Sequence, residues 1–288
     1  MTYFRPTDLS DALQWLSEDH SAADRRIIAG CTDIFPATTA QTIRGPLLDV
    51  TAIRELRGIT EFSDHWRFGA TTTWTDVIRA DLPAAFDGLK SAAREVGSVQ
   101  IQNSGTLAGN LCNASPAADG SPVWLTLDAS VELLSLSGSR VLPIATFLLG
   151  PRRTALAHGE IMTAILVPKS GAQGRSIFVK LGARKYLVIS IAMVAVRLVE
   201  QNGLILQISV AVGSCSAVPT RLPLVEAALT NHRLKTPIGT LMTDDMVRVS
   251  LSPITDVRGD AAYRLSVATE LVRRSITDLA GAPQERAA

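Results

Sequence analysis

The stretch IQNSGTLAGNLCNASPAADG, residues 101–120, constrains the fold more than any other part of the chain. It combines Gly and Ala with Thr, Asn and Ser, and it carries no charge before Asp119. Such residues do not supply the large apolar side chains of a core, whereas glycine lets a backbone approach another group closely. We therefore expect a loop whose backbone lies against a polar ligand. A purely structural loop, whose Asn and Ser side chains satisfy their own backbone, is the alternative.

Composition excludes several functional classes. The chain has 288 residues, which suffices for a well-buried core and for more than one domain. A formal net charge of +1 gives no basic excess for nucleic acid. The three cysteines, Cys31, Cys112 and Cys215, are scattered and form no CxxC pair, so we expect neither a disulfide framework nor an iron–sulfur cluster on this chain. The four histidines have no metal-ligand spacing, so we expect no metal site.

Hydropathy predicts a chain without a membrane anchor. The longest apolar run is LVISIAMVAV, residues 187–196, which is too short to span a bilayer and predicts a buried strand. The N-terminal residues lack the basic and apolar segments of a signal peptide. The sequence therefore predicts a cytoplasmic protein that does not bind a membrane.

Hydrophobic periodicity predicts an α+β protein in two parts, with a linker at 169–175. In the first part we expect a helix after Thr7, buried strands at 27–29 and 46–50, a strand–turn–strand unit before a helix at 74–80, a helix at 89–97, a hairpin within 123–148 and a strand at 160–168. The second part begins strand-rich, with a hairpin turn at Asn202–Gly203, and its last hundred residues look helical.

A first glycine turn, IIAGCTD, follows the predicted strand at 27–29. Gly30 permits close approach, and successive main-chain N–H groups in such a turn form a concave site for an anion. Thr32 adds a hydroxyl, and Asp33 suits a structural or ribose-directed role better than a phosphate contact. A simple connection between strand and turn is the alternative, and these residues alone favour it.

The stretch 101–120 suits a ligand with a pyrophosphate and a sugar. Its N–H groups and hydroxyls would bind phosphate, and Asp119 would bind a ribose hydroxyl. It contains neither the GK[ST] of a Walker loop nor GxGxxG.

Both turns resemble a known family. AGCTD and IQNSGTLAGNLCNASPAADGSPVWLTLDA are similar to the two FAD-binding signatures, AGGTD and IRN-x-GT-x-GGN-x-C-N-A-S-P-A-A-D, of the flavoprotein subunit of molybdenum hydroxylases. This family includes the FAD domain of xanthine dehydrogenase and the medium subunit of carbon monoxide dehydrogenase. The resemblance extends through GPRRTAL, GEIMTAILVP, VKLGAR and YRLSVATELVRR, over nearly the whole chain.

The resemblance implies a fold and its boundaries. Residues 1–170 would form a two-lobed PCMH-type (vanillyl-alcohol-oxidase-like) FAD-binding domain, with lobe 1 at about 1–55 and lobe 2 at about 56–170. Residues 176–284 would form a smaller α+β C-terminal domain of the CO dehydrogenase flavoprotein type.

The resemblance also implies the residues that contact FAD. Ile28, Ala29, Gly30, Cys31, Thr32, Asp33 and Ile34 would run along the pyrophosphate. Contacts from the other lobe would come from Thr106, Ala108, Gly109 and Asn110, with further contacts from Gly97, Asn113, Ser115, Asp119 and Met162. Lys180 would stabilise the reduced, anionic flavin.

Three departures from the family pattern bear on these roles. Cys31 and Ala108 stand where the family has glycine, and Cys31 suits its position if its φ is negative. No carboxylate is present at Lys185–Tyr186, where the family often has an acid.

The implied function is the FAD step of a molybdenum hydroxylase. Electrons would arrive from [2Fe–2S] clusters of a small partner subunit, reduced in turn by a large molybdopterin subunit, and would leave to NAD or another acceptor. We expect no catalytic acid–base pair on this chain, because the redox chemistry belongs to the cofactor. The alternatives are a stand-alone FAD-dependent oxidoreductase and a degenerate, non-enzymatic scaffold subunit.

Overall fold

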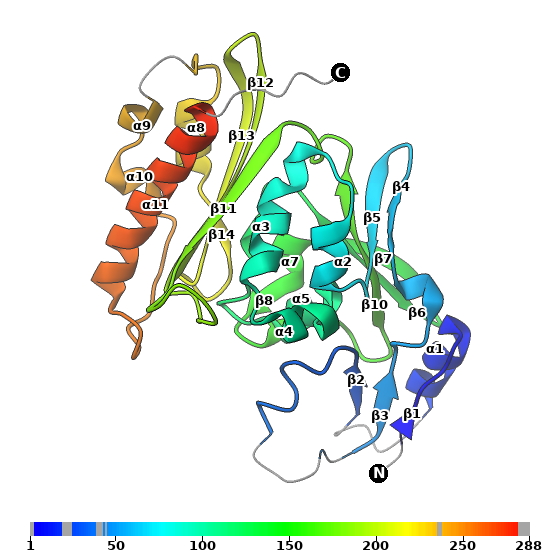
Figure 1. Ribbon diagram of the computed structural model, residues 1–288. Coiled ribbons are helices and arrows are strands. Elements are labelled where there is room, and N and C mark those ends of the chain that lie inside the picture. The colour runs from blue at the N-terminus through cyan, green and yellow to red at the C-terminus, as the bar shows by residue number, and fades with distance from the viewer. Residues whose placement is uncertain (1–2, 19–24, 39–42, 44, 235–237, 282–288) are drawn as a thin grey trace. The chain divides into compact units, whose positions relative to one another are not determined.

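The computed structural model describes residues 3–18, 25–38, 43, 45–234 and 238–281. The chain divides into two compact units, each assembled from separated segments. The first unit comprises 1–80, 96–115 and 128–169, and the second comprises 81–95, 116–127 and 170–288. Figure 1 labels most of their helices and strands.

A small parallel sheet opens the first unit. Its strands are β1 (Tyr3–Phe4), β3 (Leu47–Asp49) and β2 (Arg26–Ile28), in that spatial order. Helix α1 (Leu9–Ser17) buries Leu13, Trp15 and Leu16 in a core cluster with residues that follow β3. The strand expected at 27–29 is thus present one residue earlier, but its predicted burial is wrong, because β2 is an edge strand and Ile27 is 37% exposed.

A five-stranded antiparallel sheet is the larger sheet of the first unit. Its order is β4 (Ile59–Glu61), β5 (His65–Gly69), β10 (Ile161–Pro168), β6 (Ser130–Ser135) and β7 (Gly138–Pro143). The expected hairpin within 123–148 is confirmed in its middle, as β6–β7. Around these strands lie η2 (Arg54–Leu56), α2 (Trp74–Arg79), α7 (Ile144–Phe147), β8 (Leu148–Gly150) and β9 (Arg153–Thr154).

The stretch 101–120 is largely helical, so the expectation of a long loop is wrong. Helix α4 (Val99–Ser104) precedes α5 (Leu107–Asn113), and α6 (Gly120–Thr126) follows. Side chains cap the first two: Ser98 Oγ accepts the Ile101 N–H at 3.4 Å, and Thr106 Oγ1 accepts the Gly109 N–H at 3.1 Å. Caps satisfy orphan N–H groups that so short a helix otherwise leaves open.

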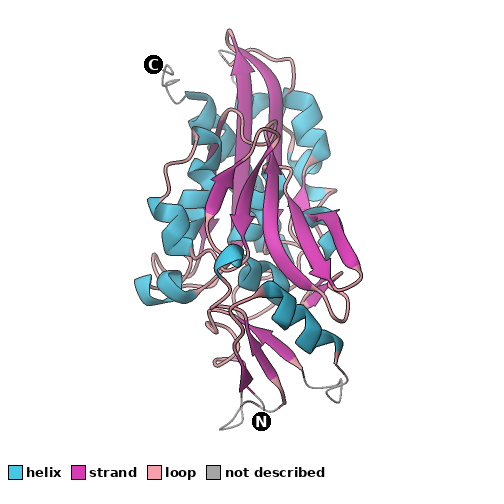
Figure 2. Cartoon of the chain, turned by 90° about the vertical axis from the view of Figure 1, so that its right-hand side faces the viewer, coloured by secondary structure: helices cyan, strands magenta, loops and turns pink. Residues whose placement is uncertain are grey.

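The second unit is built on a four-stranded sheet. Strands β11 (Arg175–Leu181), β12 (Ala192–Gln201), β13 (Leu204–Gly213) and β14 (Thr220–Arg221) are hydrogen-bonded in this order. The two longest, β12 and β13, form the predicted hairpin, which Figure 2 shows among the magenta strands. Asn202 and Gly203 have φ of 53° and 76°, as a two-residue type I′ turn requires.

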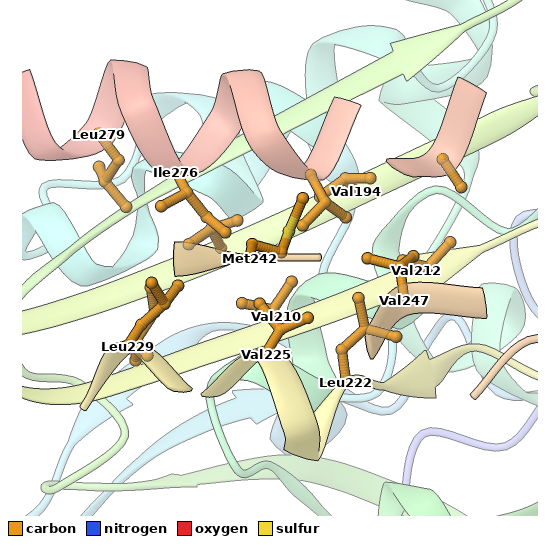
Figure 3. Close-up of a cluster of buried hydrophobic side chains, with 14 of the residues drawn as sticks. Val194, Val210, Val212, Leu222, Val225, Leu229, Met242, Val247, Ile276 and Leu279 are labelled. Atoms are coloured by element: carbon orange, nitrogen blue, oxygen red, sulfur yellow. The ribbon is translucent and has the colours of Figure 1, made fainter. Parts of the chain in front are cut away.

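Helices cover both faces of this sheet. On one face, α8 (Pro223–Leu229), α9 (Ile238–Leu241), α10 (Asp244–Arg248) and α11 (Ala261–Gly281) bury alternate residues of β12 and β13 (Figures 1 and 3). On the other, η3 (Ala84–Phe86), α3 (Asp87–Glu95) and α6 contact β11, β12 and β13. Both faces of β12 are therefore buried, which explains its continuous apolar sequence.

Candidate cofactor site

The first glycine turn of the first unit lies against the end of helix α4. Strand β2 ends at Ile28, and the chain bends through Ala29 and Gly30. A Cβ built on Gly30 would lie 1.8 Å from the main-chain oxygen of Ser104, so no other residue fits there without movement. The same bend brings Thr32 to Gly105, where a Cβ would lie 3.4 Å from Thr32 Oγ1. The structure thus brings together the two turns singled out in the sequence.

The main-chain N–H groups of the first turn are available to a ligand. Within the described residues, the N–H groups of residues 30–34 have no hydrogen-bond acceptor in the chain. Cys31 has φ 58°, in the left-handed region, so the condition that its φ be negative is not met. A left-handed residue within a turn, as here between the bend at Gly30 and the turn that begins at Thr32, can gather successive N–H groups into one concave anion site. The turn therefore has the geometry of an anion nest, at the cost of strain at Cys31.

The main-chain N–H groups at the start of α5 are used within the protein. Leu107 N donates to Thr72 O at 2.9 Å, and Ala108 N donates to Ala70 O at 3.2 Å. The N–H groups of Gly109 and Asn110 donate to Thr106, at Oγ1 and O. Each of these amides already has an acceptor within the protein, so side chains are better placed than amides for a ligand contact at this segment. The predicted phosphate contact of these amides stays a prediction.

Asn110 offers such a side chain. Its Oδ1 is buried and has no hydrogen-bond partner among the described residues. An acceptor left unpaired in a protein interior costs about 1–3 kcal/mol. A ligand N–H or O–H at this atom would remove that cost.

The other predicted residues of the first unit occupy different environments. Gly97 has φ 53° and lies close to the side chain of Ile101, where its Cβ would clash at 2.9 Å. Asn113 ends α5, and Ser115 follows the left-handed Ala114. Met162 is buried on β10, beside a register shift in the pairing with β6.

Asp119 and Lys180 belong to the second unit, where they form a buried ion pair. Lys180 Nζ lies 2.9 Å from Asp119 Oδ2, and also donates to Glu95 O and Val188 O at 3.2 and 3.3 Å. Ser190 Oγ donates to Asp119 Oδ1 at 2.6 Å. Burial raises the pKa of Asp119 above its ordinary value, although Lys180 and Ser190 act in the opposite direction. The three acceptors of Lys180 Nζ match the three protons of its ammonium group, so each proton has an acceptor within the chain.

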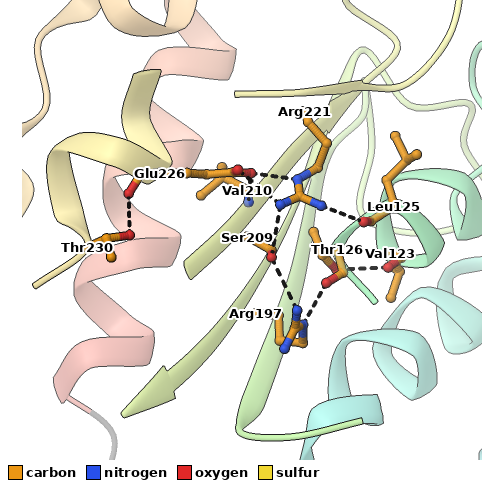
Figure 4. A network of polar contacts seen from close by, with 9 residues as sticks. All are labelled: Val123, Leu125, Thr126, Arg197, Ser209, Val210, Arg221, Glu226 and Thr230. Atoms are coloured by element: carbon orange, nitrogen blue, oxygen red, sulfur yellow. Dashed lines mark hydrogen bonds and ion pairs between the residues drawn. The ribbon is translucent and has the colours of Figure 1, made fainter. Parts of the chain in front are cut away.

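Two arginines hold the helix that begins beside Asp119. Arg221 Nη1 donates to Leu125 O at 2.9 Å, and Arg197 Nε donates to Thr126 O at 2.6 Å (Figure 4). Both guanidinium groups also donate to Ser209 Oγ. Cations at the C-terminal carbonyls of a helix stabilise it, so the sheet fixes α6 at its far end.

Burial keeps the three cysteine thiols protonated. It raises the pKa of Cys112 to about 12 and that of Cys215 to about 11. Burial, followed by the nearby Asp49 carboxylate, also raises the pKa of Cys31. Protonated thiols are poor metal ligands and poor nucleophiles, which agrees with structural roles for all three.

The sequence reasoning missed Ser104 and Arg152. Ser104 lies inside the stretch 101–120, and its main-chain oxygen, which has no sequence signature, makes the close approach to Gly30. Arg152 lies in GPRRTAL and contacts Asn113 at the end of α5. The motif indicated the family, but nothing in it indicated that contact.

Comparison with known proteins identifies the family. The family described as FAD binding domain in molybdopterin dehydrogenase matches residues 1–170. The chain belongs to this family. The CO dehydrogenase flavoprotein C-terminal domain matches residues 177–279. The recognised resemblance and the α+β, PCMH-type fold class are thereby confirmed, and the chain is an FAD-binding oxidoreductase subunit of the molybdenum hydroxylase family.

Individual relatives match along almost the whole chain. It is 31% identical over 279 residues to the nicotine 6-hydroxylase medium subunit of Paenarthrobacter nicotinovorans, covering 96% of both chains. It is 28% identical over 289 residues to a putative xanthine dehydrogenase FAD-binding subunit of Escherichia coli (strain K12), covering 98% of this chain and 96% of the relative. Reconstituted CO dehydrogenase from Oligotropha carboxidovorans contains a chain of similar fold, with TM-score 0.88, 26% identity and 97% coverage of both chains.

The helices of the described residues show no membrane span, since none of them combines sufficient length with sufficient hydropathy.

Proposed function

We propose that this chain carries electrons through FAD between the iron–sulfur clusters of a partner subunit and a final acceptor, NAD or another oxidant. Bound FAD supplies the chemistry, because it accepts and releases the electrons. The chain's own residues bind the cofactor, orient it and exclude water from it. We further propose a small [2Fe–2S] subunit and a large molybdopterin subunit as partners, in the cytoplasm.

The free N–H groups of the first glycine turn carry the proposal. The amides of residues 30–34 have no acceptor among the described residues, and Gly30 permits this bend to lie against Ser104 of α4. Such a bend suits the diphosphate of FAD. The unpaired Oδ1 of Asn110 suits a hydroxyl or an N–H, and FAD offers both. The described residues of the first unit therefore fit this cofactor.

The cysteines support the proposed source of electrons. The whole sequence contains only Cys31, Cys112 and Cys215, fewer than the four ligands of a [2Fe–2S] cluster. Two of these thiols have strongly raised pKa values and remain protonated. A cluster that supplies electrons would therefore be held by residues outside this sequence, which agrees with the proposed partner subunit. The domain boundaries at 170 and 176 and the individual FAD contacts, including Lys180 at the flavin, stay proposals.

Purification of the tagged chain from its native host tests the proposed function. We expect a flavin absorbance spectrum, one smaller and one larger polypeptide, and iron with molybdenum in the metal analysis. A chain that purifies alone and turns over a substrate unaided would support a stand-alone FAD enzyme. A colourless chain that does not bind added FAD would support a degenerate scaffold.

A further inference from the structure

Arg152 contacts the C-terminal end of α5, the helix that carries the predicted FAD contacts Asn110 and Asn113. It lies in the turn between β8 and β9, and its Nη1 donates to both oxygens of Asn113, with 3.3 Å to the main-chain oxygen. Its own main-chain N–H donates to Ala114 O at 2.9 Å. The turn thus caps the C-terminal carbonyls of α5, which have no partner within the helix.

Two residues with strained backbone meet at this contact. Arg152 has φ 59° and Ala114 has φ 45°, and neither is glycine. Each left-handed residue costs about 1–2 kcal/mol. Strained non-glycine residues persist where the surrounding structure requires them, and they are frequent at ligand sites. Two of them joined by one hydrogen bond indicate that the position of this turn matters beyond the fold.

The chemistry of the contact determines how the Asn113 amide is oriented. A guanidinium group has donors only, so it requires the Oδ1 atom of Asn113 to face it. The amide NH2 group is then directed away from Arg152, and it has no hydrogen-bond partner among the described residues. Asn110, three residues earlier on α5, lies on the same side of the helix and carries the unpaired Oδ1.

We propose that Arg152 is a positioning residue for FAD, which holds the Asn113 amide so that its NH2 group donates to an oxygen of the cofactor. This inference rests on the proposed function and extends it, because it assigns the ligand contact to a donor whose orientation a second residue sets. Arg152 itself acts through Asn113 and does not contact the cofactor.

Titration of the deflavinated full-length chain with FAD, followed by flavin fluorescence, tests the proposal. Arg152→Met keeps the side-chain length and the strained backbone but removes the donors. We expect it to raise the Kd for FAD about tenfold, which corresponds to one hydrogen bond of about 1.4 kcal/mol. Arg152→Lys keeps a donor and should restore most of the affinity. Arg153→Met is the matched control, because the structure describes no side-chain hydrogen bond for Arg153, and its Kd should equal that of the wild type.

Asn113→Asp distinguishes the role of the Asn113 oxygen from that of its NH2 group. A carboxylate still accepts from Arg152, but it replaces the NH2 donor by an oxygen. We therefore expect it to weaken FAD binding at least as much as Arg152→Met, with little loss of stability in urea.

A double-mutant cycle determines whether Arg152 acts through Asn113. The variant carrying both Arg152→Met and Asn113→Ala should bind FAD as Asn113→Ala does alone. Additive losses would overturn the proposal, since Arg152 would then contact the cofactor directly. An unchanged Kd for Arg152→Met, with lower stability of the apoprotein, would also overturn it and leave a purely structural role. A wild-type chain that does not bind FAD would instead refute the proposed function.

Discussion

Gly30 makes the tightest backbone approach of the candidate site. The missing Cβ leaves room for the main-chain oxygen of Ser104, and the same bend carries the N–H groups of residues 30–34, which have no acceptor among the described residues. A side chain cannot avoid a clash with backbone by changing its rotamer. The first glycine turn therefore depends on this one residue.

Gly30→Ala should destabilise the apoprotein and abolish detectable FAD binding. Separating two main-chain segments to admit a methyl group costs about 1–3 kcal/mol, and the same shift opens the amide bend. Urea denaturation and flavin fluorescence measure the two effects. The matched control is Gly150→Ala, because a Cβ there meets nothing within 4 Å, and its stability should change by no more than about 0.5 kcal/mol. Full FAD affinity in Gly30→Ala would contradict the assignment of this turn.

Cys31→Gly should raise the free energy of unfolding. The left-handed backbone at Cys31 costs about 1–2 kcal/mol, which glycine would avoid. The greater freedom of glycine in the unfolded chain opposes this gain by about 0.5–1 kcal/mol. We expect a net gain of about 0.5–1 kcal/mol in urea, with FAD binding retained. Cys31→Ala removes the thiol but keeps the strain, so it should show no such gain. Equal stabilisation by both variants would assign the effect to the thiol.

Elements differ in how far the sequence predicts them. The hairpin at Asn202–Gly203 was predictable, because the turn type demands those two residues between regular strands. Helices α4 and α5 were not predicted, because Gly and Asn weaken intrinsic helix propensity and the helices depend on the caps from Ser98 and Thr106. The Asn110 and Asn113 assignments depended on the family signature, whereas the role of Arg152 depended on a tertiary contact.

Helix α6 is held at both ends by side chains from the sheet of the second unit. The Asp119–Lys180 pair connects its N-terminal end to β11, and Arg197 and Arg221 bind its C-terminal carbonyls (Figure 4). Asp119 and Lys180 are only 8% and 6% exposed. Removing Lys180 would leave the Asp119 carboxylate buried without a cation, whereas removing Asp119 would still leave Lys180 Nζ 3.8 Å from Glu95 Oε2.

Lys180→Met should lower the free energy of unfolding by about 3–5 kcal/mol, and Asp119→Asn should lower it by less, because Lys180 keeps the Glu95 carboxylate at 3.8 Å. The double variant should lose much less than the sum, because neither buried charge remains unpaired. Urea denaturation of the deflavinated chain, with unchanged m-values as the control for two-state unfolding, measures all four states. Strict additivity would show that the two groups do not stabilise each other.

At the scale of the whole molecule, the compact units do not follow the order of the sequence. Helices α3 and α6 precede residue 170, yet they cover one face of the β11–β14 sheet. Gly88 N donates to Ser176 Oγ at 2.8 Å, so even the backbone of α3 is fixed to β11. Hydropathy predicted a linker and a strand-rich part after residue 170, but it could not predict which helices would cover the later sheet.

A fragment of residues 170–288 should therefore fail to form a stable domain, because it exposes one apolar face of its sheet. We expect a weak near-ultraviolet circular dichroism spectrum and strong binding of a hydrophobic dye. The control joins residues 81–127 to residue 170 by a short flexible linker. Arg197 binds both Thr126 O and Ser170 O, at 2.6 and 3.2 Å, so the two ends lie close together. A cooperative transition in the short fragment alone would contradict this assignment.

A crystal structure of the chain grown with FAD tests the central claim most directly. We predict that diphosphate oxygens lie about 2.7–3.2 Å from main-chain nitrogens of residues 30–34, with Asn110 and Asn113 also in contact with the cofactor. A diphosphate bound elsewhere, with those amides left in solvent, would contradict the account.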